Sequence, residues 1–348
     1  MGVGIWLYST FDNVDGKQAR RTGSSSPLGE LFDHGVDALN STFGTILQAA
    51  SLGSGLTGYF STLVFMITTA FFFSTWETYY TGTLYLGYIN GPTEGLLLAV
   101  FSLVVSGIYG PKVWWIKIED ILAVPFFPKS IVQLRLIDIS IGSMLFLLAA
   151  TQVPVRVYES WIGYLFIYFK TILSPSCLNT FSKCFMPIIV GYNLSIMRVR
   201  DACRIKKRSF MLAMLHVIPY CIINVSLYLW ITAPGSIALS THGILLACTW
   251  GISFGRIAAM IVLGHVTHTQ YPTYTLIIIP YVVGAILARA PQINGTTIFG
   301  GITETRYIQT LFSFVVIDYV LWILTVIRQF CSHLGIQCLR IPYKKKQA

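Results

Sequence analysis

Four aspartates near the amino end are spaced as if to hold metal ions. Asp12 and Asp15 are three positions apart, and Asp33 and Asp37 are four apart, on either side of a polar stretch at 22–27. Residues three or four positions apart share one face of a helix, so each pair predicts two carboxylates together at a helix end. Carboxylates crowded in this way cannot all stay ionised unless cations lie between them. The two pairs therefore predict a two-metal site suited to phosphoryl chemistry.

Small and basic residues accompany the aspartates. Gly16 directly follows the first pair and Ala19 keeps the same face small, so a phosphate can approach the backbone closely. Arg20 and Arg21 come next and are suited to bidentate hydrogen bonds with phosphate oxygens. Gly29 lies four residues before the third aspartate and leaves that face open. This pattern favours a phosphate ligand beside the metal ions.

Two further residues are candidates for positions near the predicted metal site. His34 is displaced by one residue from Asp33, about 100° around a helix, so it borders the predicted metal site without pointing into it. Glu94 opens an apolar stretch after Pro92. It orients the histidine, binds a metal-linked water, or is an ordinary acidic residue at a helix start. The same ordinary explanation suits Glu30 well. It does not account for four aspartates at matched helical spacing.

The elements that position these residues must lie in a membrane. Of the 348 residues, 54% are hydrophobic and only 11% are charged, and the mean hydropathy is +0.67. We expect one all-α membrane domain over residues 1–348, with about nine to eleven transmembrane helices and a basic tail at 329–348. The last turns of a first span are expected over residues 1–11. Further candidate spans are 34–52, 57–75, 92–109, 136–151, 183–197, 209–232, 241–264, 274–289 and 307–328.

The net charge of +10 does not indicate nucleic-acid binding, because the basic residues form short clusters between apolar stretches. Clusters at 17–21, 198–208 and 344–346 all fall on one side of the membrane if the short aromatic stretch 160–173 also crosses it. That arrangement is typical of cytosolic loops that face anionic lipid. The seven cysteines form no CxxC pair, which argues against a zinc site.

Three charged residues outside the motif leave alternatives open. Glu77 ends a predicted span and either helps to bind a substrate head group or solvates a helix end. Arg256 and Asp318 fall within apolar spans, where charged side chains are costly and often functional. A structural role between helices is an equal alternative for this pair.

The motif resembles that of a known family. The stretch from Asp12 to Asp37 reads D-x2-D-G-x2-A-R-x8-G-x3-D-x3-D, and every fixed position of the CDP-alcohol phosphotransferase motif is matched. The residues Gly16–Thr22 and Ser24–Gly35, with the later stretch Asn90–Gly95, are similar to the eukaryotic choline/ethanolaminephosphotransferase branch. The order and number of predicted spans fit the same branch.

This resemblance implies an integral membrane enzyme of the endoplasmic reticulum or Golgi, with its active site in a cavity on the cytosolic side. It implies transfer of phosphocholine or phosphoethanolamine from CDP-choline or CDP-ethanolamine to diacylglycerol, the final step of the Kennedy pathway. It also implies a homodimer. Acyl-chain and head-group preference stay open.

The resemblance also implies roles for individual residues. Two Mg²⁺ or Mn²⁺ ions would be held by the four aspartates, Asp12, Asp15, Asp33 and Asp37. The substrate would lie against Gly16, Ala19, Arg20 and Gly29. The base would be Asp37, as proposed for much of the family, or His34 assisted by Glu94, as this branch favours.

The amino end departs from the family pattern, because relatives carry a complete first span before the motif and this chain begins at Met1. We therefore weigh an alternative, a truncated and catalytically impaired membrane fragment of such an enzyme. A cation transporter is a third possibility, but it would need acidic residues spread through several spans rather than gathered in one region.

Overall fold

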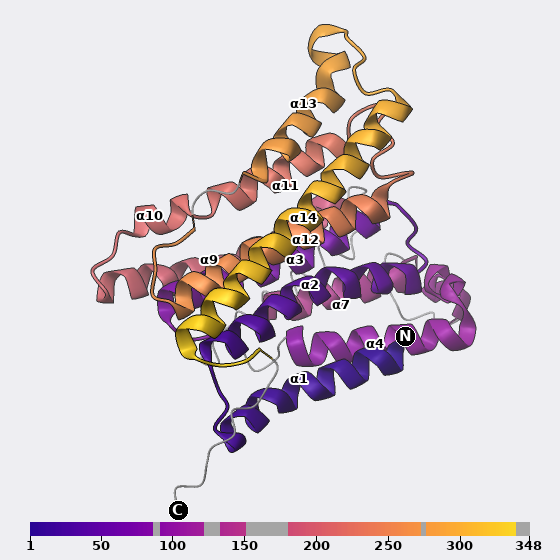
Figure 1. Ribbon diagram of the computed structural model, residues 1–348. Helices are drawn as coiled ribbons and strands as arrows, with labels where there is room; N and C mark the ends of the chain where they lie inside the picture. The colour runs from indigo at the N-terminus through magenta and orange to yellow at the C-terminus, as the bar shows by residue number, and fades with distance from the viewer. Residues whose placement is uncertain (86–90, 122–132, 151–179, 273–275, 339–348) are drawn as a thin grey trace, which may run out of the picture. The chain divides into compact units, whose positions relative to one another are not determined.

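The computed structural model describes residues 1–85, 91–121, 133–150, 180–272 and 276–338. These residues are mostly helical, and the only strand-like pairing among them is an isolated bridge between Lys117 and Arg135. The predicted all-α class is confirmed (Figure 1). The chain forms two compact units. Unit 1 comprises Met1–Ser9 and Ser41–Leu215, and unit 2 comprises Thr10–Asn40 and His216–Ala348.

Four helices in the described parts of the chain are long and apolar enough to cross a membrane. They are Gly58–Thr81, Phe210–Ile231, Gly243–Val266 and Gly301–Leu334. Shorter apolar helices cover Thr93–Tyr109 and Ile278–Ile293. The polytopic membrane class is thereby confirmed, whereas the count of about nine to eleven crossings stays a prediction. The candidate stretch 160–173 lies outside the described residues.

The motif region forms two helices, α1 (Gly2–Thr22) and α2 (Pro27–Ser51), and the boundary between the units falls within both. Helix α1 is continuous through the first aspartate pair. The expectation that Asp12 and Asp15 end a helix is therefore wrong, because the polar residues after them still form helical turns as far as Thr22. Helix α2 begins seven residues before the predicted span at 34.

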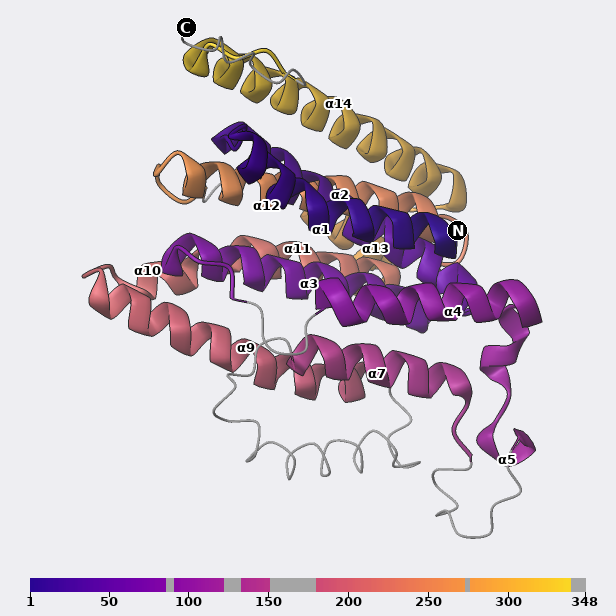
Figure 2. The ribbon, with the colours of Figure 1, turned by 90° about the horizontal axis from the view of Figure 1, so that it is seen from below.

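Unit 1 contains the other helices that the structure describes between residues 58 and 215. They are α3 (Gly58–Thr81), the π-helical turn η1 (Gly91–Gly95), α4 (Leu96–Tyr109), the 3₁₀ turn η2 (Pro111–Trp115), α5 (Ile118–Ile121), α7 (Leu136–Ala150), α9 (Thr180–Ile205) and α10 (Phe210–Leu215). Helix α9 packs against both α3 and α7, and Figure 2 shows α7 and α9 side by side. Trp76 of α3 is fully buried, and its indole N–H donates to the Ala213 carbonyl at 3.2 Å.

Polar side chains join the end of α2 to α4 within unit 1. The Gln48 amide donates to the Ser102 hydroxyl, and the Ser106 hydroxyl donates to the Ser51 carbonyl at 2.7 Å. The Trp114 indole N–H in turn donates to the Ser106 hydroxyl at 2.7 Å. Hydrogen bonds of this kind hold helices together in a membrane, where the hydrophobic effect does not drive helices to associate.

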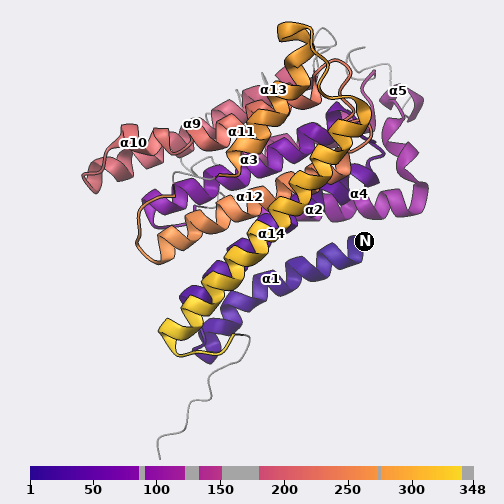
Figure 3. The ribbon, with the colours of Figure 1, turned by 45° about the horizontal axis from the view of Figure 1, so that its top comes forward.

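Unit 2 contains α11 (Ile218–Ile231), α12 (Gly243–Val266), α13 (Ile278–Asn294) and α14 (Gly301–Leu334). Helix α11 packs against α13 and α12 against α14, and the latter pair run together in Figure 3. Helix α14 continues six residues past the predicted span end at 328, so the predicted tail from 329 begins as helix.

One corner of unit 2 is organised by a buried carboxylate. Glu304 of α14 is 1% exposed and accepts hydrogen bonds from the Trp230 indole at 2.8 Å, the Ser236 hydroxyl at 2.6 Å and the Ile237 N–H at 3.0 Å. The same tryptophan ring lies against Gly284 of α13, where a built Cβ would meet ring carbons at 2.5–2.9 Å. Three donors satisfy the carboxylate, as a buried charged group requires.

Candidate metal and substrate site

A short turn between α1 and α2 sets the register of the motif. The Ser24 N–H donates to the Ala19 carbonyl at 2.9 Å, and Gly23 between them has φ +64°. This is the glycine-terminated helix end in which the left-handed residue must lack a Cβ to avoid strain. Helix α2 then starts at Pro27, with the Gly29 N–H donating to the Ser26 hydroxyl at 3.1 Å. The predicted polar turn is confirmed.

The turn brings carboxylates of the two helices together in unit 2. One oxygen each of Asp12, Asp15 and Asp33 lie within 4.8 Å of one another. The Asp37 carboxyl is close enough to Asp12 for its charge to act on that group. The structure thus gathers all four predicted aspartates, and their role as metal ligands stays a prediction.

The electrostatics of the cluster suit a cation. The pKa of Asp12 is raised to about 6, first by burial and then by the neighbouring charges of Asp37 and Asp15. Burial also raises the pKa of Asp33, against the opposing effect of His34. Carboxyl groups whose pKa is raised by burial and by neighbouring carboxylates gain most from a bound divalent ion. The donor set is all-oxygen, which is the chemistry that Mg²⁺ and Mn²⁺ prefer.

The other predicted site residues of the two helices border this cluster. The Nδ1 atom of His34 is 3.9 Å from an Asp33 oxygen, and the imidazole is partly exposed. A Cβ built on Gly16 would lie 3.6 Å from the Arg20 guanidinium, so the arginine side chain folds back along α1. Ala19 is half-buried, and Gly29 is exposed, with only the Ser26 hydroxyl near its missing Cβ.

Glu94 lies in η1, which belongs to unit 1, whereas the aspartate cluster belongs to unit 2. It is half-buried at the start of the apolar helix that ends at Tyr109, as its place after Pro92 predicted. Its proposed assistance to His34 stays a prediction.

Close packing behind α2 fixes the helix that carries the second aspartate pair. A Cβ built on Gly255 of α12 would lie 2.6 Å from the Leu39 side chain, and one built on Gly35 would lie 3.8 Å from the Ala259 Cβ. Leu31 adds a buried contact to the same side, in a cluster with Ala259, Val262 and Val326. The sequence analysis missed this support, although a glycine inside an apolar span was a visible signal.

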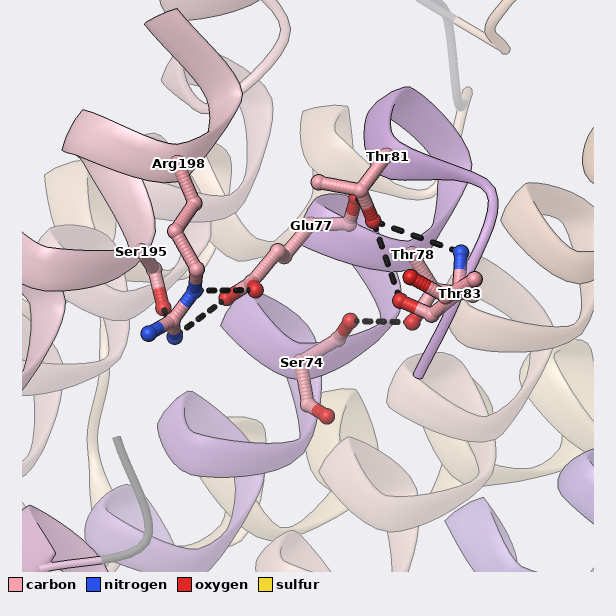
Figure 4. A network of polar contacts seen from close by, with 7 residues as sticks. All are labelled: Ser74, Glu77, Thr78, Thr81, Thr83, Ser195 and Arg198. Carbon is pink, nitrogen blue, oxygen red and sulfur yellow. Dashed lines mark hydrogen bonds and ion pairs between the residues drawn. The ribbon is translucent and has the colours of Figure 1, made fainter. Parts of the chain in front are cut away.

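Glu77 does not solvate a helix end, and that interpretation is wrong. Its side chain is 3% exposed and forms a bidentate ion pair with Arg198 of α9, with one contact of 2.8 Å (Figure 4). The arginine in turn lies 4.4 Å from the centre of the Tyr85 ring. A buried carboxylate needs such a partner, and here the partner is 121 positions away in the chain.

Comparison with known proteins is consistent with this arrangement. A family model described as CDP-alcohol phosphatidyltransferase matches residues 2–148. A Dictyostelium discoideum protein described as an uncharacterized CDP-alcohol phosphatidyltransferase class-I family protein is 30% identical over 99% of this chain and 78% of its own length. An Arabidopsis thaliana protein named choline/ethanolaminephosphotransferase 2 has the same identity and coverage.

A higher identity is confined to part of the chain. A Saccharomyces cerevisiae protein named choline/ethanolaminephosphotransferase 1 is 48% identical over 113 residues, or 32% of this chain and 29% of its own length. Together with the nearly full-length matches and the aspartate cluster, this similarity shows that the chain belongs to the CDP-alcohol phosphatidyltransferase family.

Proposed function

We propose that this protein transfers phosphocholine or phosphoethanolamine from CDP-choline or CDP-ethanolamine to diacylglycerol, with release of CMP. The observation that carries the proposal is the convergence of Asp12, Asp15 and Asp33 oxygens within 4.8 Å in a membrane protein of this family. The named relatives support the choice of donors. A membrane location supports a lipid acceptor.

The four aspartates of α1 and α2 would hold two Mg²⁺ or Mn²⁺ ions. Such ions, when bound, neutralise the diphosphate of the donor and the charge that develops on the leaving CMP. The carboxylate oxygens fit this role because they are numerous and close together, with Asp12 and Asp33 partly buried and Asp15 exposed.

The residues around the cluster would position the donor. Arg20 offers a planar set of N–H donors for the phosphate oxygens, and its fold along Gly16 supports a role over that part of α1. Gly16, Ala19 and Gly29 would let the donor approach the two helices closely. Substitution by larger side chains at these positions is then expected to raise the KM for the donor.

The transferred group must pass to a deprotonated oxygen. We assign His34 to remove the proton from the diacylglycerol hydroxyl as its oxygen attacks the β-phosphorus, while the bond from that phosphorus to CMP breaks. A neutral imidazole is suited to accept a proton near neutral pH, whereas an aspartate that holds a metal is a weak base. Glu94 would assist the histidine, and Asp37 is the alternative base.

For the cellular setting we propose the endoplasmic reticulum or Golgi membrane, an active site open to the cytosol, and a homodimer. Labelling of a cysteine introduced at exposed Lys17, in sealed microsomes, tests the orientation of α1. Reaction with an impermeant maleimide before the vesicles are opened is the result expected for a cytosolic site.

The test of the activity is CMP release from CDP-choline and from CDP-ethanolamine, in microsomes that lack other enzymes of this kind. We expect release that depends on diacylglycerol and on Mg²⁺ or Mn²⁺, and that is lost in Asp33→Asn. Asp120→Asn is the matched control, since Asp120 is an exposed acidic residue of α5 in unit 1. A normal rate in Asp33→Asn would remove the mechanism.

The same assay tests the alternative that the chain is an impaired fragment. That alternative requires a chain that inserts into the membrane but does not turn over donor even with all four aspartates present. The complete motif and matches that cover 99% of the chain favour the active enzyme.

A further inference from the structure

A strongly basic turn joins α9 to α10 in unit 1. The residues from Arg200 to Arg208 include five basic side chains and a single acidic one, Asp201. The acidic side chain lies 3.7 Å from its neighbour Arg200. We refer to residues 204–208, which include four of the five basic side chains, as the basic turn. All five of its residues are exposed.

The backbone of the basic turn is held in a fixed conformation. The Arg208 N–H donates to the Cys203 carbonyl at 2.8 Å, and the Lys207 N–H donates to the Arg204 carbonyl at 3.4 Å. This pair of bonds is the helix ending in which one residue adopts the left-handed conformation. That residue is Lys207, with φ +51°, at a position where glycine is the usual choice because a Cβ is unfavourable.

Contacts on both sides anchor the turn. The Lys206 ammonium donates to the Tyr80 carbonyl at 2.7 Å and to the Thr81 carbonyl at 3.1 Å, at the end of α3. The Ser209 hydroxyl accepts a hydrogen bond from the Leu212 N–H at 3.3 Å and so caps α10. One lysine is therefore occupied in holding the turn to α3. Neither Arg204 nor Lys207 forms an ion pair within the described residues.

Exposed apolar side chains flank the basic ones. Ile205 is 81% exposed and Met211 is 70% exposed. The residues that follow, Phe210–Ile231, form a helix long and apolar enough to cross a membrane. The basic turn therefore lies at the end of a candidate span, where apolar side chains can enter the acyl region and cationic ones remain among the head groups.

We propose that the basic turn is a binding site for the anionic head group of a membrane phospholipid. Arg204, Lys207 and Arg208 would donate hydrogen bonds to the phosphate oxygens, while Ile205 and Met211 would contact the acyl chains. The strained lysine is the most telling feature, because a glycine at this position would form the same turn with less strain but without the charge.

The variant Lys207→Gly gives a direct test, because it is expected to keep the fold while removing the charge. The protein is purified in a neutral detergent and titrated with phosphatidylserine, and bound lipid is counted by native mass spectrometry. Removal of one cationic side chain is expected to weaken phosphatidylserine binding about fivefold, with thermal stability unchanged or increased. Lys112→Gln is the control, because Lys112 is an exposed lysine of η2 and should leave binding unchanged.

Three results bear on the proposal. Weaker binding in Lys207→Gly and a further loss in Arg204→Gln/Lys207→Gly, with Lys112→Gln unchanged, would support it. Equal binding by all four proteins would overturn it. Displacement of the lipid by inorganic phosphate or glycerophosphoserine at equal concentration would also overturn it, because the site would then be one for soluble anions.

Discussion

Arg256 of α12 and Asp318 of α14 lie 2.9 Å apart, measured from Nε to Oδ2, within the two longest apolar helices of unit 2. The Nε atom makes no hydrogen bond of good angle with the described residues, so the contact is mainly electrostatic. The guanidinium also lies 5.7 Å from the centre of the Trp322 ring. This geometry supports the structural alternative for the two charged residues over a role in chemistry.

Loss of one partner of this pair should destabilise unit 2. We expect Asp318→Asn to cost about 3 kcal/mol, because Arg256 would then remain without its counter-charge in apolar surroundings. The double variant Arg256→Met/Asp318→Leu should recover most of that loss. Thermal unfolding in detergent measures both. If the loss of stability in the double variant equals the sum of the losses in the two single variants, the two residues do not interact.

Gly284 should not tolerate a methyl group. A Cβ there would lie 2.5–2.9 Å from carbons of the Trp230 ring, which is fully buried and held by its hydrogen bond to Glu304. We therefore expect Gly284→Ala to lower the free energy of unfolding by about 3 kcal/mol. Gly107→Ala in α4 is the control, because no atom lies within 4 Å of a Cβ at that helical position. Unchanged melting of Gly284→Ala would contradict this packing.

The aspartate cluster predicts an unusual dependence of stability on pH. Since the pKa of Asp12 is raised from 3.8 to about 6, the folded state binds this proton more tightly than the unfolded chain does. In the presence of a chelator, the protonated Asp12 carboxyl contributes its full stabilisation below pH 3.8, and this stabilisation is lost as the pH rises through about 6. We expect the melting temperature of metal-free protein to fall across this range.

Divalent cations and one variant provide the controls for this pH effect. Mg²⁺ or Mn²⁺ should raise the melting temperature most above pH 6, where the carboxylates are ionised, and little below it. Asp12→Asn should flatten the profile of the metal-free protein. A melting temperature at pH 7 that is the same with and without these cations would contradict a metal site in this cluster.

His34 should affect the chemical step more than donor binding. We expect His34→Gln to lower kcat by about 10²–10⁴-fold with little change in the KM for the donor, because a general base acts in the transition state. His333→Gln, at an exposed position of α14, is the matched control. Normal kcat in His34→Gln, together with loss in Asp37→Asn, would assign the base to the aspartate instead.

Local sequence patterns predicted much of the helical framework and the turn of the motif. Gly23 and Pro27 bracket a stretch of polar residues, and the structure ends α1 and begins α2 at these positions. Apolar stretches predicted the helices at 93–109, 136–150, 210–231 and 243–266 to within two residues, whereas α3, α9 and α14 extend six to eight residues past the predicted ends. These features are readable because caps, breakers and periodicity act over a few neighbouring residues.

Partners distant in the chain could not be read in the same way. Glu77 and Arg198 both stood out as charged residues near predicted span ends, but nothing in their local patterns pairs residues 121 positions apart. The fit of Leu39 against Gly255, and of Trp230 against Gly284, depends on how helices cross. Helix packing of this kind is set by shape complementarity, which a single sequence does not display.

The turn at Gly23–Ser26 makes chain length itself a constraint on this protein. Both of its ends are fixed by backbone hydrogen bonds, so it has no slack to absorb an added or deleted residue. One residue inserted into the first turn of α2 would rotate Asp33 and Asp37 by about 100° relative to α1. Apart from Gly23, side chains of this segment can therefore be exchanged with less harm to the aspartate cluster than a change in the number of residues between the two pairs would cause.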